Sequence, residues 1–242
     1  MREPPALAQL RAQIAEIEGV AARHAHLAFG VEAIDALLPG SGIAAGALHE
    51  VAGSRELADD AAATVFLAGI LSRFEGPVFW CLRYRDLFAP ALHLAGLHPD
   101  RVIFVETASD THVLTAMEEC LRHPGLAGVV GELGKVGLTS SRRLQLAAET
   151  SGTPAFLFRR ASDPDKRTEG SAAVTRWRVR AAPSEQLGIP SLGRPRWELA
   201  LERARGGDPH LWIVEGCDAQ GRIALPAQLA DRPAAQDGRQ AA

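Results

Sequence analysis

A short glycine loop holds the residue pattern of this chain that comes closest to a chemical motif. Nucleoside triphosphates are held by G-x-x-x-x-G-K-[ST], where glycines expose backbone N–H groups, lysine neutralises phosphate and a hydroxyl binds magnesium. From Gly53 the sequence reads G-S-R-E-L-A-D-D, so Ala58 replaces the second glycine, Asp59 the lysine and Asp60 the hydroxyl residue. Each carboxylate placed beside a triphosphate costs about 1–4 kcal/mol. We therefore expect poor nucleotide binding at this loop.

The segments around this loop indicate an α/β protein. Short apolar strand-like segments alternate with helix-like segments between residues 47 and 158, and the first of the helix-like segments is 61–71. This alternation predicts a mostly parallel central sheet covered by helices. After Ala172 the pattern becomes strand after strand, at 175–181, 196–203 and 211–215, with Gly206-Gly207 as a turn. These last strands predict an antiparallel extension of the sheet near the C-terminus.

Length and apolar content favour one folded domain with short appendages. The chain has 242 residues, of which 47% are apolar, enough for one full core. Residues 29–224 form the predicted core domain, and the Ala- and Pro-rich tail 225–242 is predicted to be disordered. Residues 1–28 contain a predicted amphipathic helix at 6–18, which either packs on its own core or docks on a partner or a second copy. Its apolar face carries Leu7, Leu10, Ile14 and Ile17.

Charge and cysteine usage exclude several function classes. The formal charge of −3 gives no general attraction to nucleic acid or anionic lipid. Cys81, Cys120 and Cys217 form no C-x-x-C pair and the histidines are scattered, so we expect neither a disulfide framework nor a metal site. No apolar segment is long enough to cross a membrane and no signal peptide is evident. A cytoplasmic protein is predicted.

The segment before and through the glycine loop identifies a family resemblance. The stretch F-G-V-E-A-I-D-A-L-L-P-G-S-G-I-A-A-G-A-L-H-E-V-A-G (29–53) is similar to the opening segment of RecA-like domains. The matching residues are Phe29, Gly30, Ile34, Asp35, Leu38, Gly42, Gly46, Glu50 and Gly53. Within that superfamily the chain most resembles the ImuA proteins of bacterial mutagenesis cassettes. The residues that carry this resemblance are A-L-H-E-V-A-G (47–53), F-W-C-L-R-Y-R-D-L-F-A-P-A-L (79–92), G-L-H-P-D-R-V-I-F-V-E (96–106), G-L-A-G-V-V-G-E (125–132) and R-W-E-L-A-L-E-R-A-R-G-G (196–207).

The resemblance implies that the positions used for ATP hydrolysis have been replaced. Arg83 and Tyr84 stand where a RecA-type ATPase carries the carboxylate that orients water, and Asp86 is the nearest acid. Glu132 is the candidate for the Walker B carboxylate, although an ordinary strand-end acid explains it equally well. Arg159 takes the place of the polar sensor that couples ATP to DNA binding. We therefore expect no ATPase activity and no cofactor.

A basic segment matches the position of the second DNA-binding loop in RecA-like proteins. It suggests a phosphate-contacting patch with a tryptophan available for base stacking. Alternating arginines on a strand are also what its solvated face would carry, and this alternative stays open. The candidate DNA-contacting residues are Arg159, Arg160, Lys166, Arg167, Arg176, Trp177 and Arg178.

The resemblance implies a non-catalytic RecA-like adaptor in damage-induced (SOS), error-prone translesion DNA synthesis. The implied partners are ImuB, the error-prone C-family DNA polymerase through ImuB, and RecA on single-stranded DNA; self-association is a further expectation. One alternative is a SulA-like cell-division inhibitor, since that family also resembles RecA without a working nucleotide site. Another is an ATP-binding RecA-like regulator with a relocated lysine, for which Lys135 is the nearest candidate.

Overall fold

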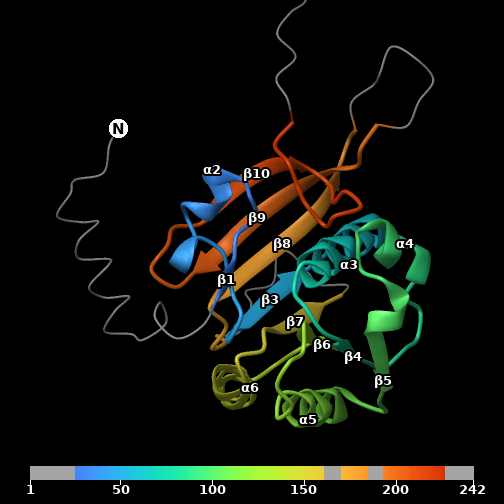
Figure 1. Cartoon of the computed structure of the whole chain (residues 1–242), viewed down its shortest axis with the longest axis vertical. Coiled ribbons are helices and arrows are strands. Elements are labelled where there is room, and N and C mark those ends of the chain that lie inside the picture. Colours follow the sequence, from blue (N-terminus) through green and yellow to red (C-terminus); the bar gives the residue numbers. More distant parts are fainter. Residues whose placement is uncertain (1–24, 161–169, 185–192, 227–242) are drawn as a thin grey trace, which may run out of the picture.

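An eight-stranded sheet organises the part of the chain that the computed structural model describes, residues 25–160, 170–184 and 193–226 (Figure 1). The strands lie in the order β10-β9-β8-β3-β7-β6-β4-β5. Their bounds are β3 (Leu48–Ala52), β4 (Val78–Leu82), β5 (Val102–Glu106), β6 (Gly128–Glu132), β7 (Ala155–Arg159), β8 (Thr175–Ala182), β9 (Arg196–Ala204) and β10 (His210–Glu215).

The sheet is parallel from β8 to β5 and antiparallel beyond β8. Strand β3 pairs in parallel with both β7 and β8, whereas β9 pairs antiparallel with β8 and with β10. Gly206 has a φ of 74° in the turn between β9 and β10, a left-handed conformation that glycine adopts without steric cost. The predicted α/β class and its antiparallel extension are confirmed.

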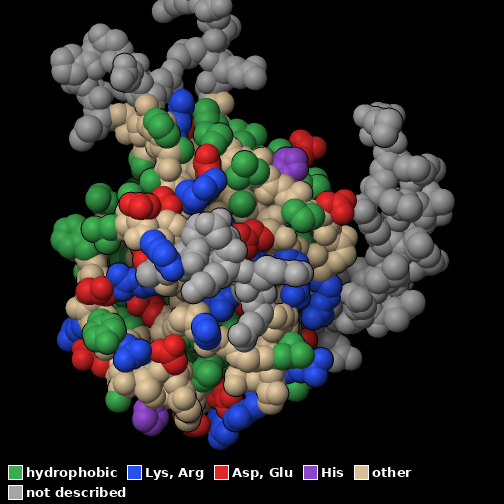
Figure 2. Space-filling model, turned by 180° about the vertical axis from the view of Figure 1, so that it is seen from behind, with side chains coloured by type: hydrophobic (Ala, Val, Ile, Leu, Met, Phe, Trp, Pro, Cys, Tyr) green, Lys and Arg blue, Asp and Glu red, His purple; other side chains and the backbone are tan. Residues whose placement is uncertain are grey.

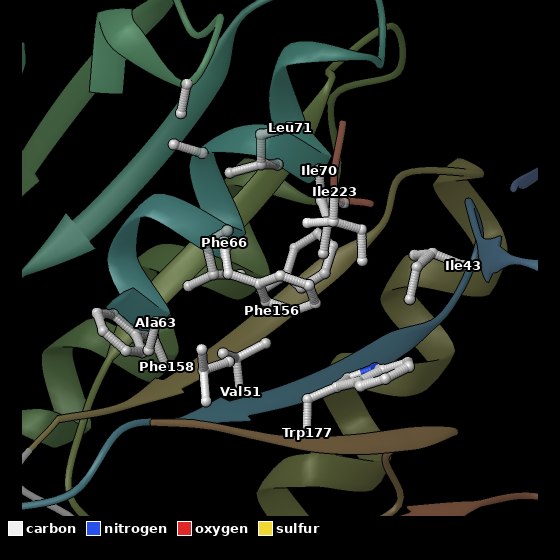
Figure 3. Close-up of a cluster of buried hydrophobic side chains, with 14 of the residues drawn as sticks. Ile43, Val51, Ala63, Phe66, Ile70, Leu71, Phe156, Phe158, Trp177 and Ile223 are labelled. Atoms are coloured by element: carbon white, nitrogen blue, oxygen red, sulfur yellow. The ribbon is translucent and has the colours of Figure 1, made fainter. Parts of the chain in front are cut away.

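In the described part of the chain, helices cover both faces of the sheet (Figure 1). Helix α3 (Leu57–Ser72) and helix α4 (Ala89–Leu94) lie on one face, and α5 (Asp110–Cys120) and α6 (Leu138–Ser151) lie on the other. Each face has its own apolar core. Phe66 of α3 packs with Phe156 and Trp177 on the first face (Figure 3), and Met117 of α5 packs with Leu144 of α6 on the second.

A short segment before β3 is fixed by one carboxylate. It contains β1 (His26–Leu27), α2 (Glu32–Asp35), the 3-10 turn η1 (Pro39–Ser41) and β2 (Ile43–Ala44). A second 3-10 turn, η2 (Pro99–Arg101), lies elsewhere in the chain, directly before β5. Asp35 Oδ1 accepts the N–H of Phe29 at 2.7 Å, and Oδ2 accepts the N–H groups of Gly30 and Val31 at 2.9 and 3.1 Å. The aspartate of this segment therefore closes the turn that leads into the sheet.

One element boundary differs from the prediction in a way that matters for the site. The sequence predicts a helix over 61–71, but α3 begins four residues earlier, at Leu57. Asp59 and Asp60 lie buried in its first turn, where the partial positive charge of a helix N-terminus favours carboxylates. The predicted helix at 6–18 and the tail beyond residue 226 lie outside the described residues.

Candidate functional site

The loop between β3 and α3 is closed by its own side chains. Ser54 Oγ donates to Asp59 Oδ2 at 2.6 Å and accepts the backbone N–H of Glu56 at 3.0 Å. The other carboxylate oxygen, Asp59 Oδ1, accepts the backbone N–H of Ala181 on β8 at 2.8 Å. The residue at the lysine position of a phosphate-binding loop is thus used here to tie the loop to the neighbouring strand.

Asp60 packs directly on the first glycine of the loop. A Cβ atom on Gly53 would lie 2.2 Å from Asp60 Oδ1 and 2.8 Å from its Cα, so only glycine allows this approach. Asp60 is buried. A phosphate that approached the loop would meet this carboxylate at contact distance, and two negative charges in a partly desolvated site repel strongly.

Glu132, the candidate Walker B residue, ends β6 and is bound by the protein itself. Trp80 Nε1–H donates to Glu132 Oε1 at 2.7 Å, and Arg160 Nη1 donates to Oε2 at 3.2 Å. Burial raises the pKa of Glu132, and the hydrogen bonds and charge of Trp80 and Arg160 oppose that shift. Both oxygens of this carboxylate therefore have partners within the fold.

Arg160 forms the centre of an ion-pair network at this end of the sheet. Its guanidinium binds Asp86 with two hydrogen bonds, Nη1 to Oδ1 at 2.6 Å and Nη2 to Oδ2 at 2.9 Å, and its Nε lies 4.0 Å from Asp60 Oδ2. Hydrogen bonding to Asp86 raises the pKa of Arg160, and the same contact lowers the pKa of Asp86. Arg160 and Asp86 therefore stabilise the charged forms of each other.

A pocket of about 310 Å³ opens beside this network, where the parallel strands β4 and β6 end. Ligands of open α/β sheets usually bind at the carboxyl ends of the strands. Of the described residues that line the pocket, four are acids and two are arginines. The lining residues are Asp60, Arg83, Tyr84, Asp86, Asp110, Glu132, Leu133, Gly134 and Arg160.

The arginines predicted to contact DNA are mostly engaged inside the protein. Arg159 is buried and its Nε donates to the carbonyl of Gly134 at 3.3 Å. On β8, Arg176 Nε pairs with Glu50 at 2.6 Å and Arg178 Nε pairs with a β9 glutamate at 2.5 Å. Figure 2 shows basic and acidic side chains mixed over the face that it draws. The described arginines therefore do not form a continuous basic patch on that face.

The predicted base-stacking role of Trp177 is wrong for the folded chain. Its side chain is completely buried, with ring centroids 5.5 Å from Phe29 and 5.9 Å from Phe66. Its indole N–H donates to Thr175 Oγ1 at 2.9 Å. The alternation on β8 points the tryptophan toward the core while the arginines face away, so a nucleic acid base could reach Trp177 only if the core opened.

Six predicted residues lie outside the described residues. These are Lys166 and Arg167 of the candidate DNA loop and Leu7, Leu10, Ile14 and Ile17 of the candidate partner helix. Their predicted roles stay predictions.

The sequence reasoning missed the partnership of Trp80, Glu132 and Arg160 with Asp86. These residues come from β4, β6, the end of β7 and the β4–α4 loop, so no local spacing relates them. One sequence feature could have indicated part of this network. A buried indole N–H needs a hydrogen-bond acceptor, and the sequence places a tryptophan in one buried strand and a glutamate at the end of another.

Among residues 25–160, 170–184 and 193–226, no group of three or more His, Cys, Asp and Glu side chains is arranged to hold a metal ion. Within those same ranges no helix is both long and apolar enough to cross a membrane.

The fold and the site together define an α/β protein in which the loop after the first core strand is occupied by carboxylates. No protein-family model matches the chain. It is 37% identical over 234 residues to Protein ImuA of two strains of Caulobacter vibrioides, NA1000 / CB15N and ATCC 19089 / CIP 103742 / CB 15. Each match covers 88% of this chain and 94% of the Caulobacter protein. The chain belongs to the ImuA family.

Proposed function

We propose that the chain is a non-catalytic RecA-like adaptor that acts in damage-induced, error-prone translesion DNA synthesis. Membership of the ImuA family supports the process, because ImuA proteins belong to mutagenesis cassettes together with ImuB. The closed β3–α3 loop supports the absence of catalysis, and this is the observation on which the adaptor role depends.

The side chains at the positions that an ATPase uses for catalysis are bound to other groups of the protein. Asp59 ties its loop to β8 through the N–H of Ala181, and Glu132 is bound by Trp80 and Arg160. Hydrolysis requires a carboxylate or amide free to orient water and a cation free to neutralise phosphate. We infer that this end of the sheet preserves a shape and carries out no reaction.

An adaptor role gives the chain protein partners. ImuB is the direct partner in this proposal, and the error-prone C-family DNA polymerase joins through ImuB. RecA on single-stranded DNA and a second copy of the chain are further partners of the proposed assembly. Because Arg176 and Arg178 are paired with glutamates, direct DNA contact is a smaller part of the proposal than protein contact.

Titration of the purified chain tests this function. Calorimetry and size-exclusion chromatography with ImuB, and separate calorimetry with magnesium-ATP, distinguish an adaptor from a nucleotide-dependent protein. A complex with ImuB of micromolar or tighter affinity, with no heat from ATP, is expected. Tight ATP binding with no ImuB complex would overturn the proposal.

No observation favours the two alternative functions. Lys135, the candidate relocated lysine, is exposed and is absent from the lining of the pocket. A Lys135→Ala variant serves as the control in the ATP titration, and it should behave as the unaltered chain does. A parallel pull-down with the tubulin-like division protein tests the SulA-like alternative.

A further inference from the structure

Three of the most exposed apolar side chains of the described residues line the charged pocket or follow or precede one of its residues closely in the chain. Among the large apolar residues that are exposed, four stand out, at 80% for Leu57, 68% for Tyr84, 69% for Phe88 and 72% for Leu94. Tyr84 lines the pocket itself. Leu57 comes one helical turn before the pocket residue Asp60.

Phe88 follows the pocket residue Asp86 by two positions and is the N-cap residue of α4. Three of the four most exposed apolar side chains, Leu57, Tyr84 and Phe88, are therefore part of the pocket or close to it in the chain. Exposed aromatic and aliphatic side chains grouped in this way usually mark a protein-binding surface, because burial on binding removes them from water.

The interior of the pocket has the opposite character. Asp86 and Glu132 are matched by Arg160, and Asp110 is matched by Arg83 through contacts of 2.6, 3.2 and 3.4 Å. Among the described lining residues, the acidic side chains outnumber the arginines by four to two. This excess of acids favours a ligand that carries positive charge.

The rim adds a second preference for a cation. The Tyr84 ring is exposed, and the guanidinium carbon of Arg83 already lies 5.3 Å from its centroid. A tyrosine face attracts cations through its quadrupole. Tyr84 therefore offers a cation the same kind of contact that it makes with Arg83.

We propose that this surface, formed by the pocket together with Leu57, Tyr84 and Phe88, binds a protein segment that presents one arginine or lysine between apolar residues. The basic side chain enters the pocket among the carboxylates, and the flanking apolar residues cover Leu57 and Phe88. The acidic lining of the pocket accounts for the basic residue of the segment. The exposed apolar side chains of the rim account for its apolar residues. A phosphate-bearing ligand meets neither requirement.

This inference rests on the proposed function, because it assigns the binding surface for its protein partner. The first test is site-specific cross-linking in the complex with ImuB. A photoreactive p-benzoylphenylalanine replaces Phe88 in one variant and Leu146 in a control variant. Leu146 is 61% exposed on α6, which covers the opposite face of the sheet. The expected result is a cross-link from position 88, and not from position 146, to an ImuB peptide with a basic residue flanked by apolar ones.

The second test measures affinity for ImuB with matched substitutions. Phe88→Ser and Tyr84→Ser should each weaken binding about tenfold or more, as loss of an interface hot spot does. Serine is a favoured N-cap residue, so Phe88→Ser is expected to keep α4 folded. Leu146→Gln is the control and should leave the affinity unchanged.

A charge variant separates the pocket from its rim. Asp110→Asn removes one charge and keeps an oxygen that can accept the N–H of Gly134, now 3.2 Å away. It should weaken binding about threefold at low salt and less at high salt, because interfacial charge acts mainly through screened attraction.

The outcomes distinguish this inference from the function on which it rests. Normal ImuB affinity of Phe88→Ser and Tyr84→Ser, or cross-links from position 146 and none from 88, would refute the surface and leave the adaptor function standing. If the unaltered chain forms no complex with ImuB, both proposals fall.

Discussion

Replacing Arg160 with leucine tests the network that holds the carboxyl ends of the strands together. The substitution removes hydrogen bonds to Asp86 and to Glu132. Breaking a buried ion pair costs about 3–5 kcal/mol, and exposed pairs contribute about 0–1 kcal/mol. The Asp86 side chain is 52% exposed whereas Glu132 is 8% exposed. We therefore expect Arg160→Leu to lower the free energy of unfolding by about 2–3 kcal/mol.

Most of that loss should come from the buried charge of Glu132. A second substitution, Glu132→Gln, removes this charge and keeps an acceptor for the Trp80 N–H. In the Arg160→Leu background, Glu132→Gln should therefore recover about 1–2 kcal/mol, because no carboxylate is then left buried without its cation.

The loss of folding stability caused by Arg160→Leu should also depend on pH. Burial raises the pKa of Glu132, so the folded chain keeps a proton where the unfolded chain has lost it, and stability falls as pH rises through that interval. Arg160 opposes the rise in the pKa of Glu132. Without Arg160 this pKa should rise further, so the pH range over which the folded chain loses stability should extend to higher pH. The Asp86 pKa is lowered by Arg160, so its contribution is present above the unfolded pKa and is lost as pH falls through the folded one. The cost of Arg160→Leu should thus be larger at about pH 7 than at about pH 5.

Urea unfolding followed by tryptophan fluorescence measures these differences. Arg122→Leu is the control, because Arg122 pairs with Glu119 at 3.5 Å on an exposed surface and should change stability by less than about 0.5 kcal/mol. A cost of Arg160→Leu as small as this control, or an equal cost in the presence and absence of Glu132→Gln, would refute the assignment.

Three further substitutions test the loop and the core. Asp59→Ala should cost about 1–3 kcal/mol in urea unfolding because the N–H of Ala181 loses its acceptor; an unchanged midpoint would contradict this role. Gly53→Ala should cost on the order of 1–3 kcal/mol, since its Cβ would meet Asp60 at 2.2 Å, and a stabilising effect in thermal unfolding would show that the contact is absent. Trp177→Phe should lower stability and leave single-stranded DNA binding by the folded protein unchanged in fluorescence anisotropy, whereas a selective loss of DNA binding would restore the stacking role.

The sheet could be predicted from the sequence because its strands are buried on both faces. Strand β7, whose residues are all buried, leaves an apolar signal in the run A-F-L-F before Arg159. The late strand β9 alternates, with Trp197, Leu199 and Leu201 buried. Both patterns depend on neighbours along the chain, so a single sequence reveals them.

The network at the site could not be predicted because its partners are distant in the chain. Arg160 and Asp86 are 74 positions apart, and Arg176 and Glu50 are 126 apart. The arginines of β8 suggest a basic surface in the sequence, but the glutamates that pair with them come from other strands. The same limit explains Trp177, whose burial depends on Phe29 and Phe66 from two other elements.

The ion-pair network around Arg160 also affects how long this end of the sheet stays in one state. A bound nucleotide holds its site only while its concentration exceeds its dissociation constant, and the site empties after hydrolysis. Here the cation and the carboxylates of Asp86 and Glu132 belong to one chain, so each faces the others at an effective concentration that no metabolite level can change. The lifetime of a complex formed on this surface would then depend on its dissociation rate and not on the level of a nucleotide.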